Sequence, residues 1–463
     1  TVGEHEALKG IPTDWPEVLG YNKVIAKPEA EVPVTVEGDP FIAFASYGKG
    51  RSVVVTTDCA PHWAPPEFCE WEYYNKLWQN IADWLIQELL KELLTIRSVN
   101  GRDDEGAVAE YLCKYFEQSG ISAHIQRIDA THANVLAELE GESDDAPIFW
   151  NGHLDTVPYG DTGEWKTDPA VPVERDGFLY GRGASDMKSG LAAMVYALCE
   201  YKKSGRPVPH TIHFLGTCDE EKGGIGAREI LKEVPETSIG TLLIGEPTGC
   251  RLGVAQKGCL WLEIEAHGKT SHGAYPQEGC NAVEQAMALT GEIETYVKSF
   301  THPVLGASTA QVTQISGGVA PNMTPDTCRI LMDIRMTPGL TSQMVVGQAE
   351  AFAAARSVTS EEKFRVSCRI VNDRRAIEIG ESHPLVKQLS KGLEKKGLPV
   401  ETTGINFFTD ASILVEHKLD AAVLLFGPGE AGMAHKPNER VEIEKYQKSI
   451  QVLMDLIASE VDE

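Results

Sequence analysis

Acidic residues follow short apolar runs at separate places in the chain. Asp219-Glu220-Glu221 comes directly after the run Thr211–Gly216, and Glu246 ends the run Thr241–Gly245. An apolar run that ends in acids is typical of a buried strand, and open α/β sheets place their sites at the carboxyl ends of such strands. Carboxylates this close repel one another, so we expect a cation among them. A solvated acidic loop is the alternative.

Two histidines occupy comparable positions. His153 follows the apolar run Ala146–Asn151, and His435 comes after the run Ala422–Phe426. His153 and Asp155 would share one face of a strand, because side chains repeat every two residues. A carboxylate beside a histidine is the usual partner that fixes the tautomer of a metal-binding imidazole. Imidazole with carboxylates suits zinc, cobalt or manganese, and one shared carboxylate can hold two ions.

A glycine-punctuated turn, Gly181-Arg-Gly-Ala-Ser-Asp-Met-Lys-Ser-Gly190, leads into a predicted helix. Such a turn could cradle a phosphate at the helix N-terminus. It has neither the Rossmann nor the P-loop spacing, however, and Asp186 would repel a phosphate. We therefore favour a tight turn that presents Asp186 at the edge of the sheet.

The elements that must position these residues alternate between helix and strand. From about residue 86 the pattern predicts helices at 105–118 and 191–201 and strands at 146–151, 211–216 and 241–245. This alternation predicts an α/β fold with a doubly wound, mostly parallel sheet.

The middle of the chain has a different pattern. Strands at 259–267, 310–316, 328–335 and 364–371 and helices at 281–297 and 342–355 occur in the order βαββαβ. That order is the split βαβ arrangement of ferredoxin-like domains. We expect a domain inserted at 255–370, with a catalytic domain formed by 85–254 and 371–463.

Residues 1–84 form a different predicted unit. Strands at 41–45 and 52–56 flank the turn Gly48–Gly50, and an aromatic helix starting near Trp71 continues without a break to Thr95. This region resembles the C-terminal tail of a class I glutamine amidotransferase-like domain. The strand, turn and helix that would carry a nucleophilic cysteine are missing, and neither Cys59 nor Cys69 has that context. We expect no amidotransferase chemistry here.

Composition excludes several classes of partner. The net charge of −26 argues against nucleic acid and against anionic membrane surfaces. The sequence contains no run of about 18 apolar residues, so we expect no spanning helix, and no signal sequence opens the chain. The first residue is Thr1 rather than Met, which leaves room for a start further upstream. Ten scattered cysteines without a C-x-x-C pair indicate reduced thiols of a cytoplasmic protein.

From about residue 86 the chain resembles the di-zinc amidohydrolase family, which includes acetylornithine deacetylase, succinyl-diaminopimelate desuccinylase, aminoacylase and the glutamate carboxypeptidases. The motifs that carry this resemblance occur in the family's order: His-Leu-Asp-Thr-Val-Pro (153–158), Gly-Arg-Gly-Ala-Ser-Asp-Met-Lys-Ser-Gly (181–190), Asp-Glu-Glu-Lys-Gly-Gly (219–224), Gly-Glu-Pro-Thr (245–248) and Ala-His-Lys-Pro-Asn-Glu (434–439).

The resemblance implies a centre of two divalent ions, with zinc first and cobalt or manganese as alternatives. His153, Asp186 and Glu246 would hold one ion. Asp186, Glu221 and His435 would hold the other. Asp155 would orient His153, and Glu220 would be the general base.

The inserted domain would complete this site. The resemblance implies that His272 would donate to the developing oxyanion, reaching into the site of a second subunit in a homodimer formed through this domain. Asn322, Arg335 and Thr409 resemble the family's substrate-binding positions. For Arg335 a structural salt bridge is the alternative.

The resemblance implies hydrolysis of the amide bond of small N-acyl amino acids. A dipeptidase or carboxypeptidase with the same centre is the alternative within the family. A metal-binding scaffold without turnover is the alternative outside enzymes.

Overall fold

The computed structural model describes residues 1–47, 50–58, 62–143, 145–359 and 364–459. The chain forms two compact units, Thr1–Thr95 and Ile96–Glu463. Within the described ranges, none of the helices combines the length and the apolar character needed to cross a membrane. The nine cysteines in these ranges are free thiols.

The first unit is a three-stranded antiparallel sheet packed against helices. Its elements are η1 (Glu6–Leu8), β1 (Glu31–Val36), β2 (Asp39–Tyr47), β3 (Gly50–Val55), α1 (Pro66–Cys69) and α2 (Tyr74–Thr95). Phe41, Phe44, Phe68 and Trp84 lie in its core. The two predicted strands and the aromatic helix are confirmed.

Three further predictions about this unit concern the start of the aromatic helix, the two cysteines and the turn between the strands. The helix begins at Tyr74, three residues after Trp71, and runs through the expected boundary at residue 84. Cys69 is half-buried and its thiol donates to the carbonyl of Ala64. The residues predicted to form a turn at Gly48–Lys49, together with Cys59, lie outside the described part of the chain.

A large mixed sheet organises the second unit. Its strands, in spatial order, are β18 (Ile377–Glu378), β11 (Leu252–Gln256), β20 (Ala422–Leu425), β10 (Thr241–Ile244), β6 (Ile148–His153), β9 (Ile212–Thr217), β5 (Ala133–Leu139) and β4 (Ser122–Arg127), and β19 (Thr402–Ile405) pairs with β11. The centre, β20-β10-β6-β9, is parallel. Antiparallel pairs flank it on both sides.

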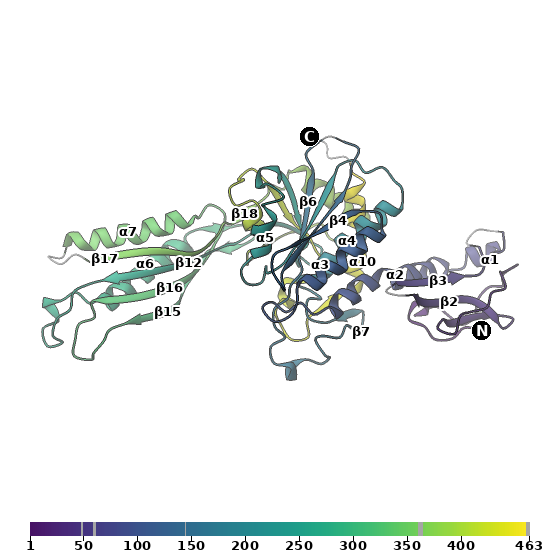
Figure 1. Ribbon diagram of the computed structural model, residues 1–463, viewed down its shortest axis with the longest axis horizontal. Coiled ribbons are helices and arrows are strands. Elements are labelled where there is room, and N and C mark those ends of the chain that lie inside the picture. Colours follow the sequence, from purple (N-terminus) through teal and green to yellow (C-terminus); the bar gives the residue numbers. More distant parts are fainter. Residues whose placement is uncertain (48–49, 59–61, 144, 360–363, 460–463) are drawn as a thin grey trace. The chain divides into compact units, whose positions relative to one another are not determined.

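Helices cover both faces of this sheet, which explains why its central strands are largely buried. All six residues of β6 are buried, as expected for a parallel strand covered on both sides. The helices are α3 (Gly106–Gln118), α4 (Lys188–Lys203), α5 (Ile225–Ile230), α8 (Pro384–Lys395), α9 (Ala411–Leu414) and α10 (Ile443–Ile457). In Figure 1, α5 lies across the sheet from α3, α4 and α10. The predicted α/β class is confirmed.

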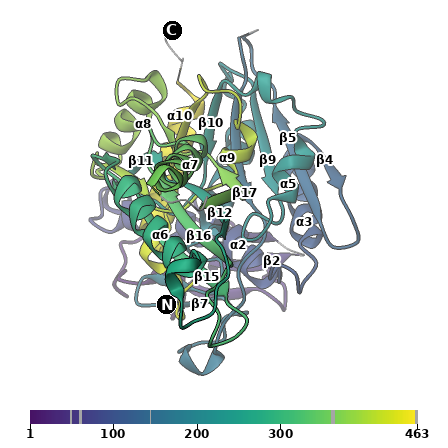
Figure 2. The same cartoon turned by 90° about the vertical axis from the view of Figure 1, so that its left-hand side faces the viewer.

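The inserted segment forms its own four-stranded antiparallel sheet in the order β15-β16-β12-β17. Its elements are β12 (Gly258–His267), α6 (Ala282–Lys298), β15 (Thr309–Gly317), β16 (Thr327–Met336), α7 (Ser342–Thr359) and β17 (Arg365–Arg374). This is the predicted βαββαβ order. Leu260, Leu262 and Ile264 alternate into a core shared with both helices, which lie on one side of the strands (Figure 2). β11 and β18 belong to the large sheet, and the domain boundaries at 255 and 370 stay a prediction.

Smaller elements complete the second unit. β7 (Val173–Arg175), β8 (Phe178–Tyr180) and β21 (Arg440–Glu442) form a short sheet, and β13 (Thr301–His302) pairs with β14 (Gly306–Ala307). Single 3-10 turns occur at η2 (Thr162–Glu164), η3 (Glu236–Ser238), η4 (Pro276–Glu278) and η5 (Ala431–Met433).

Candidate metal centre

The carboxyl ends of the parallel strands bring the predicted ligands to one edge of the large sheet. β6 ends at His153, level with Thr217 at the end of β9. The loop after β9 carries the acidic run, and the loop after β10 carries Glu246. The register of the parallel strands therefore gathers residues that are far apart in sequence.

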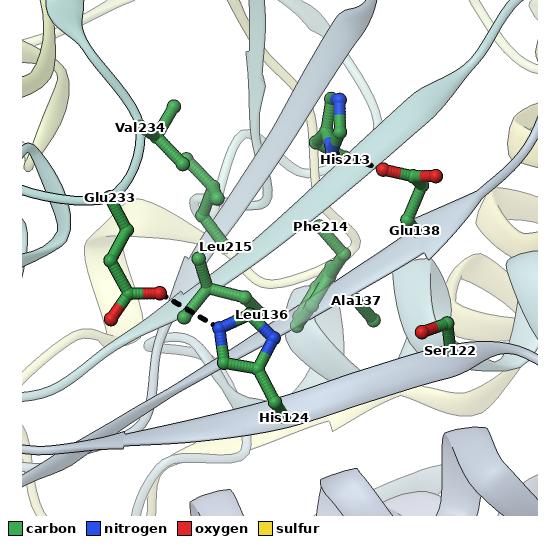
Figure 3. Close-up of a pocket in the computed structure, with 10 residues that line it drawn as sticks. All are labelled: Ser122, His124, Leu136, Ala137, Glu138, His213, Phe214, Leu215, Glu233 and Val234. Carbon is green, nitrogen blue, oxygen red and sulfur yellow. Dashed lines mark hydrogen bonds and ion pairs between the residues drawn. The ribbon is translucent and has the colours of Figure 1, made fainter.

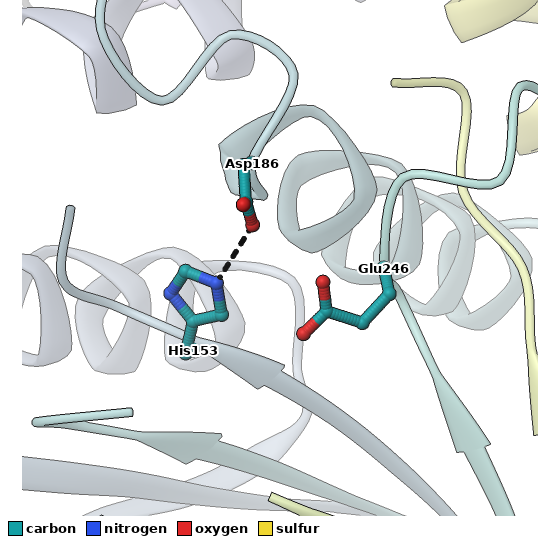
Figure 4. A group of neighbouring side chains, drawn as sticks. All are labelled: His153, Asp186 and Glu246. Carbon is teal, nitrogen blue, oxygen red and sulfur yellow. Dashed lines mark hydrogen bonds and ion pairs between the residues drawn. The ribbon is translucent and has the colours of Figure 1, made fainter. Parts of the chain in front are cut away.

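His153, Asp186 and Glu246 form what we call the first ligand group. One possible ligand atom from each lies within 4.8 Å of the others, and all three residues are buried. The Nε2 atom of His153 lies 3.1 Å from Oδ1 of Asp186. Figure 4 shows the three side chains converging from three separate segments.

Asp186, Glu221 and His435 form the second ligand group, again with ligand atoms within 4.8 Å of one another. Nε2 of His435 lies 2.9 Å from Oε2 of Glu221 and 3.3 Å from Oδ2 of Asp186. Asp186 thus presents one oxygen to each histidine. A carboxylate placed this way can bridge two cations.

Unsatisfied oxygens indicate that both groups fit cations. Oε1 of Glu221 and Oε2 of Glu246 are buried and have no hydrogen-bond partner, and a buried polar atom without a partner is costly. Burial, followed by the charge of Asp186, raises the pKa of Glu221 to about 7. Hydrogen bonds to Asp186 and Glu221 raise the pKa of His435 to about 10. Divalent cations would supply the positive charge that these carboxylates favour.

Asp155 connects His153 to the acidic run. The nearest acceptor for Nδ1 of His153 is the backbone carbonyl of Asp155 at 3.0 Å, while the carboxylate oxygen Oδ1 lies 3.6 Å away. The two carboxylate oxygens accept the backbone N–H groups of Glu220 and Glu221, each at 3.1 Å. Asp155 therefore holds the imidazole through its main chain and the acidic run through its side chain.

Glu220 lies beside the ligands but belongs to neither group. It lines a cavity of about 530 Å³ together with Asp186, Glu221, Glu246 and His435. Burial, with the charges of Glu246 and Asp410, raises the pKa of Glu220 well above its usual range. A carboxyl group of raised pKa at the cavity wall is suited to accept and return a proton.

The first residue of the acidic run, Asp219, holds the loop through hydrogen bonds. Asp219 has a left-handed backbone, with φ of 62°. Its carboxylate accepts the N–H of Ile225 at 3.1 Å and the side-chain amide of Asn100 at 3.0 Å. Asp219 therefore shapes the loop that presents its two neighbours.

The remaining wall of the cavity mixes cations and aromatic rings, with Lys222, Trp261, Arg335, Phe407 and Phe408 among its residues. Arg335 donates to both carboxylate oxygens of Asp333, at 2.8 and 3.0 Å. Its guanidinium also lies 6.0 Å from the ring centre of Phe408. Both roles considered for Arg335, a cavity residue and a salt bridge, are thus compatible with its position.

Besides His153 and Asp155, three predicted site residues are not among those that line this cavity: His272, Asn322 and Thr409. His272 and Asn322 are exposed neighbours in the inserted domain, where the N–H of Gly273 donates to the carbonyl of Asn322 at 2.8 Å. Thr409 is buried, and its hydroxyl donates to Gln256 at 2.7 Å.

Several supporting residues were missed by sequence reasoning. Asn100 donates to Oδ2 of Asp155 at 3.0 Å as well as to Asp219, and Glu105 accepts the N–H of Asp219 at 2.8 Å. Buried Glu439 accepts the N–H groups of Ser185 and Asp186. Glu439 could have been found, because it ends the motif 434–439. Asn100 and Glu105 lie in no such motif.

Comparison with known proteins gives two family matches. Residues 149–459 match a family model described as "Peptidase family M20/M25/M40". Residues 1–87 match a model described as a putative glutamine amidotransferase.

Individual relatives differ in their described activities. The chain is 28% identical over 399 residues to a probable succinyl-diaminopimelate desuccinylase of Staphylococcus epidermidis, covering 80% of this chain and 96% of the relative. It is 29% identical over 387 residues to an acetylornithine deacetylase of Proteus mirabilis, covering 80% and 95%. The crystal structure of aminopeptidase PepT from Bacillus cereus has a TM-score of 0.65 at 19% identity, covering 81% of this chain and 99% of that one.

Proposed function

This chain belongs to peptidase family M20/M25/M40, as its motifs predicted, and we propose that it is a two-metal hydrolase that cleaves the amide bond of small N-acyl amino acids. One observation carries the proposal. Two ligand groups share Asp186 and leave buried carboxylate oxygens unsatisfied, while Glu220 lines the same cavity without belonging to either group.

The first ligand group would hold one ion and the second group the other, with Asp186 between them. The mixed imidazole and carboxylate donors favour zinc, with cobalt or manganese as alternatives. Bound there, such ions polarise an amide carbonyl and lower the pKa of a water molecule.

Glu220 would move the proton. Its carboxylate accepts a proton from the attacking water and returns it to the nitrogen of the leaving amine, so that one amide and one water become one carboxylic acid and one amine. Asp155 supports this step, because its side chain holds the backbone of Glu220 in place.

Two features of the cavity support a small anionic substrate with an apolar part. Lys222 places positive charge on its wall beside Arg335, which is paired with Asp333, and Trp261, Phe407 and Phe408 supply apolar surface. The two curated relatives are described as acting on acylated amino acids. The likeness to an aminopeptidase fold favours a second candidate, a dipeptidase or carboxypeptidase with the same centre.

The exposed position of His272 and Asn322 supports a role in a second subunit's site rather than in their own. We therefore propose a homodimer through the inserted domain, with Asn322 binding substrate and His272 donating to the oxyanion. Thr409 would act indirectly, by supporting the cavity loop. Analytical ultracentrifugation tests the dimer, and a monomeric active enzyme would contradict it.

Two further proposals concern the cellular compartment and the N-terminal unit. Free thiols favour a reducing compartment such as the cytoplasm. For the N-terminal unit we propose no glutaminase activity, and release of ammonia from glutamine at an enzyme-like rate would contradict that.

The deciding experiment is Glu220→Gln, assayed with N-acetyl, N-succinyl and dipeptide substrates alongside metal analysis. We expect the rate to fall about 10²- to 10⁴-fold, the usual contribution of a general base, while two metal ions per chain remain bound. Activity that survives this change would contradict the mechanism. A chain that binds metal but hydrolyses none of the three substrate classes would be a scaffold.

A further inference from the structure

One buried ion pair contacts the loops that carry two of the proposed ligands. Glu439 is fully buried and Arg182 nearly so, and Nη1 of Arg182 donates to Oε2 of Glu439 at 2.5 Å. The pair lies outside the cavity and outside both ligand groups. The proposed hydrolysis assigns it no role.

The other oxygen of Glu439 holds the bridging ligand. Oε1 accepts the backbone N–H of Ser185 at 2.8 Å and that of Asp186 at 2.9 Å. Glu439 also ends the loop that begins at His435, so a single carboxylate connects the main chain of Asp186 to the loop of His435. These two residues supply two of the three side chains of the second ligand group.

Further contacts hold the loop of His435 at a second point. His435 and Asn438 both have left-handed backbones, with φ of 63° and 61°, which non-glycine residues rarely adopt without support. Asn438 accepts the N–H of Lys166 at 2.6 Å and donates to the carbonyl of Glu164 at 3.0 Å. The contacts of Asn438 thus stabilise an otherwise unfavourable backbone conformation of the loop.

Arg182 extends the connection to a third segment. Its Nη2 donates to the carbonyl of Pro158 at 3.1 Å, in the loop that follows Asp155. Its guanidinium lies 5.1 Å from the ring centre of Trp165. A lysine could keep the charge but not these directed contacts, because only the guanidinium fork reaches both partners.

We propose that Glu439, oriented by Arg182, is a positioning residue that sets the distance between Asp186 and His435 and thereby the affinity of the second metal ion. The inference rests on the proposed two-metal centre. It predicts an unequal effect, because Glu439 is connected to two members of the second ligand group, Asp186 and the loop of His435, but to only one member of the first, Asp186.

The test is a zinc titration of the metal-free full-length chain, comparing wild type with Glu439→Gln. We expect two ions to bind wild type, and the second ion to bind the variant at least about tenfold more weakly, in the range usual for residues that orient ligands. The first ion should lose less affinity. His435→Ala should give the same pattern, and His153→Ala should give the reverse.

Glu430→Gln is the matched control. Glu430 lies nine residues before Glu439 and pairs with Arg251 and Lys445, but its side chain does not contact the Asp186 turn. The control should bind both ions like wild type. If Glu439→Gln does not fold by circular dichroism, Arg182→Lys carries the same comparison.

Two results would overturn the inference. One is unchanged affinity for both ions in a folded Glu439→Gln or Arg182→Lys variant. The other is an equal loss for both ions, which would indicate a general structural role. Wild type that binds no zinc would instead contradict the proposed function itself.

Discussion

The candidate metal centre and a groove on the face of the same sheet contain the same residue types in different arrangements. The groove has a volume of about 250 Å³, and its wall includes Ser122, His124, Glu138, His213 and Glu233 (Figure 3). Nε2 of His124 lies 2.8 Å from Oε2 of Glu233. Nδ1 of His213 lies 3.5 Å from Oε2 of Glu138. Each histidine thus has one acidic partner.

Strand register explains why the groove does not form a ligand group. Glu138 lies opposite His213, whereas His124 lies opposite Leu136, whose other neighbour is Leu215. Leucines therefore occupy the row beside His124, and no three donors of the groove come together among the groups found in the described chain. At the strand ends, loops can converge freely. Convergence and burial, rather than residue type, distinguish the metal centre.

The largest effect is expected from replacing Asp186, which belongs to both ligand groups. Asp186→Ala removes a carboxylate from both ligand groups, and we expect hydrolysis to fall by about 10³-fold or more because both ions are affected. Metal analysis should show a loss of bound ions. Glu233→Ala in the groove is the control and should retain both ions and full activity.

A smaller effect is expected from replacing Asp155, which lies next to His153, than from replacing Asp186. Asp155→Asn removes one of the two carboxylate acceptors for the N–H groups of Glu220 and Glu221. It should lower metal affinity or activity by about 10- to 100-fold, the range usual for residues that support a metal ligand. Glu138→Gln changes the partner of His213 in the same way and should leave both properties unchanged. If metal titration gave the two variants the same metal affinity, the distinction between the candidate metal centre and the groove would be contradicted.

The groove residue His213 should instead affect how the folding stability of the protein depends on pH. Burial lowers the pKa of His213, so the unfolded chain binds more protons than the folded one below the ordinary histidine pKa of about 6.5. Stability then falls as the pH drops through that value. The test is urea unfolding measured between about pH 8 and pH 5. The free energy of unfolding should change less with pH in His213→Gln than in wild type.

The smallest effect is expected at His124, whose ring is more than half exposed. His124→Gln breaks a solvent-screened pair, so the free energy of unfolding should change by at most about 1 kcal/mol. Metal content and activity should stay at the wild-type level. A loss of bound zinc in this variant would mean that the groove contributes to metal binding.

Local patterns predicted much of the fold. The buried run of β6 and the alternation of β12 are periodic over short stretches, so their strands were recognisable from sequence. β4 was not predicted, because it is a short edge strand with mostly polar residues. The buried strand β5 beside it was missed as well. These strands make the flank of the sheet antiparallel where the sequence suggested a mostly parallel one.

The site was predictable to the extent that its residues follow apolar runs or occur in motifs. His153, Glu221 and Glu246 were found in this way, and the structure brings them to one edge. The contact of Glu439 with Asp186 was not predictable, because it joins distant segments that only the assembled fold brings together. The choice of the Asp155 carbonyl over its carboxylate depends on a backbone turn that no sequence pattern reports.

The position of the inserted domain has a consequence for synthesis. His153, Asp186, Glu221 and Glu246 all precede this domain in the chain, and His435 follows it. A ribosome therefore translates the whole inserted segment after it has made the acidic ligands and before it makes the last histidine. The proposed second ion would therefore have its full set of ligands only after that segment has been synthesised. Binding of both ions would then show that the parts of the large-sheet domain before and after the inserted segment have come together.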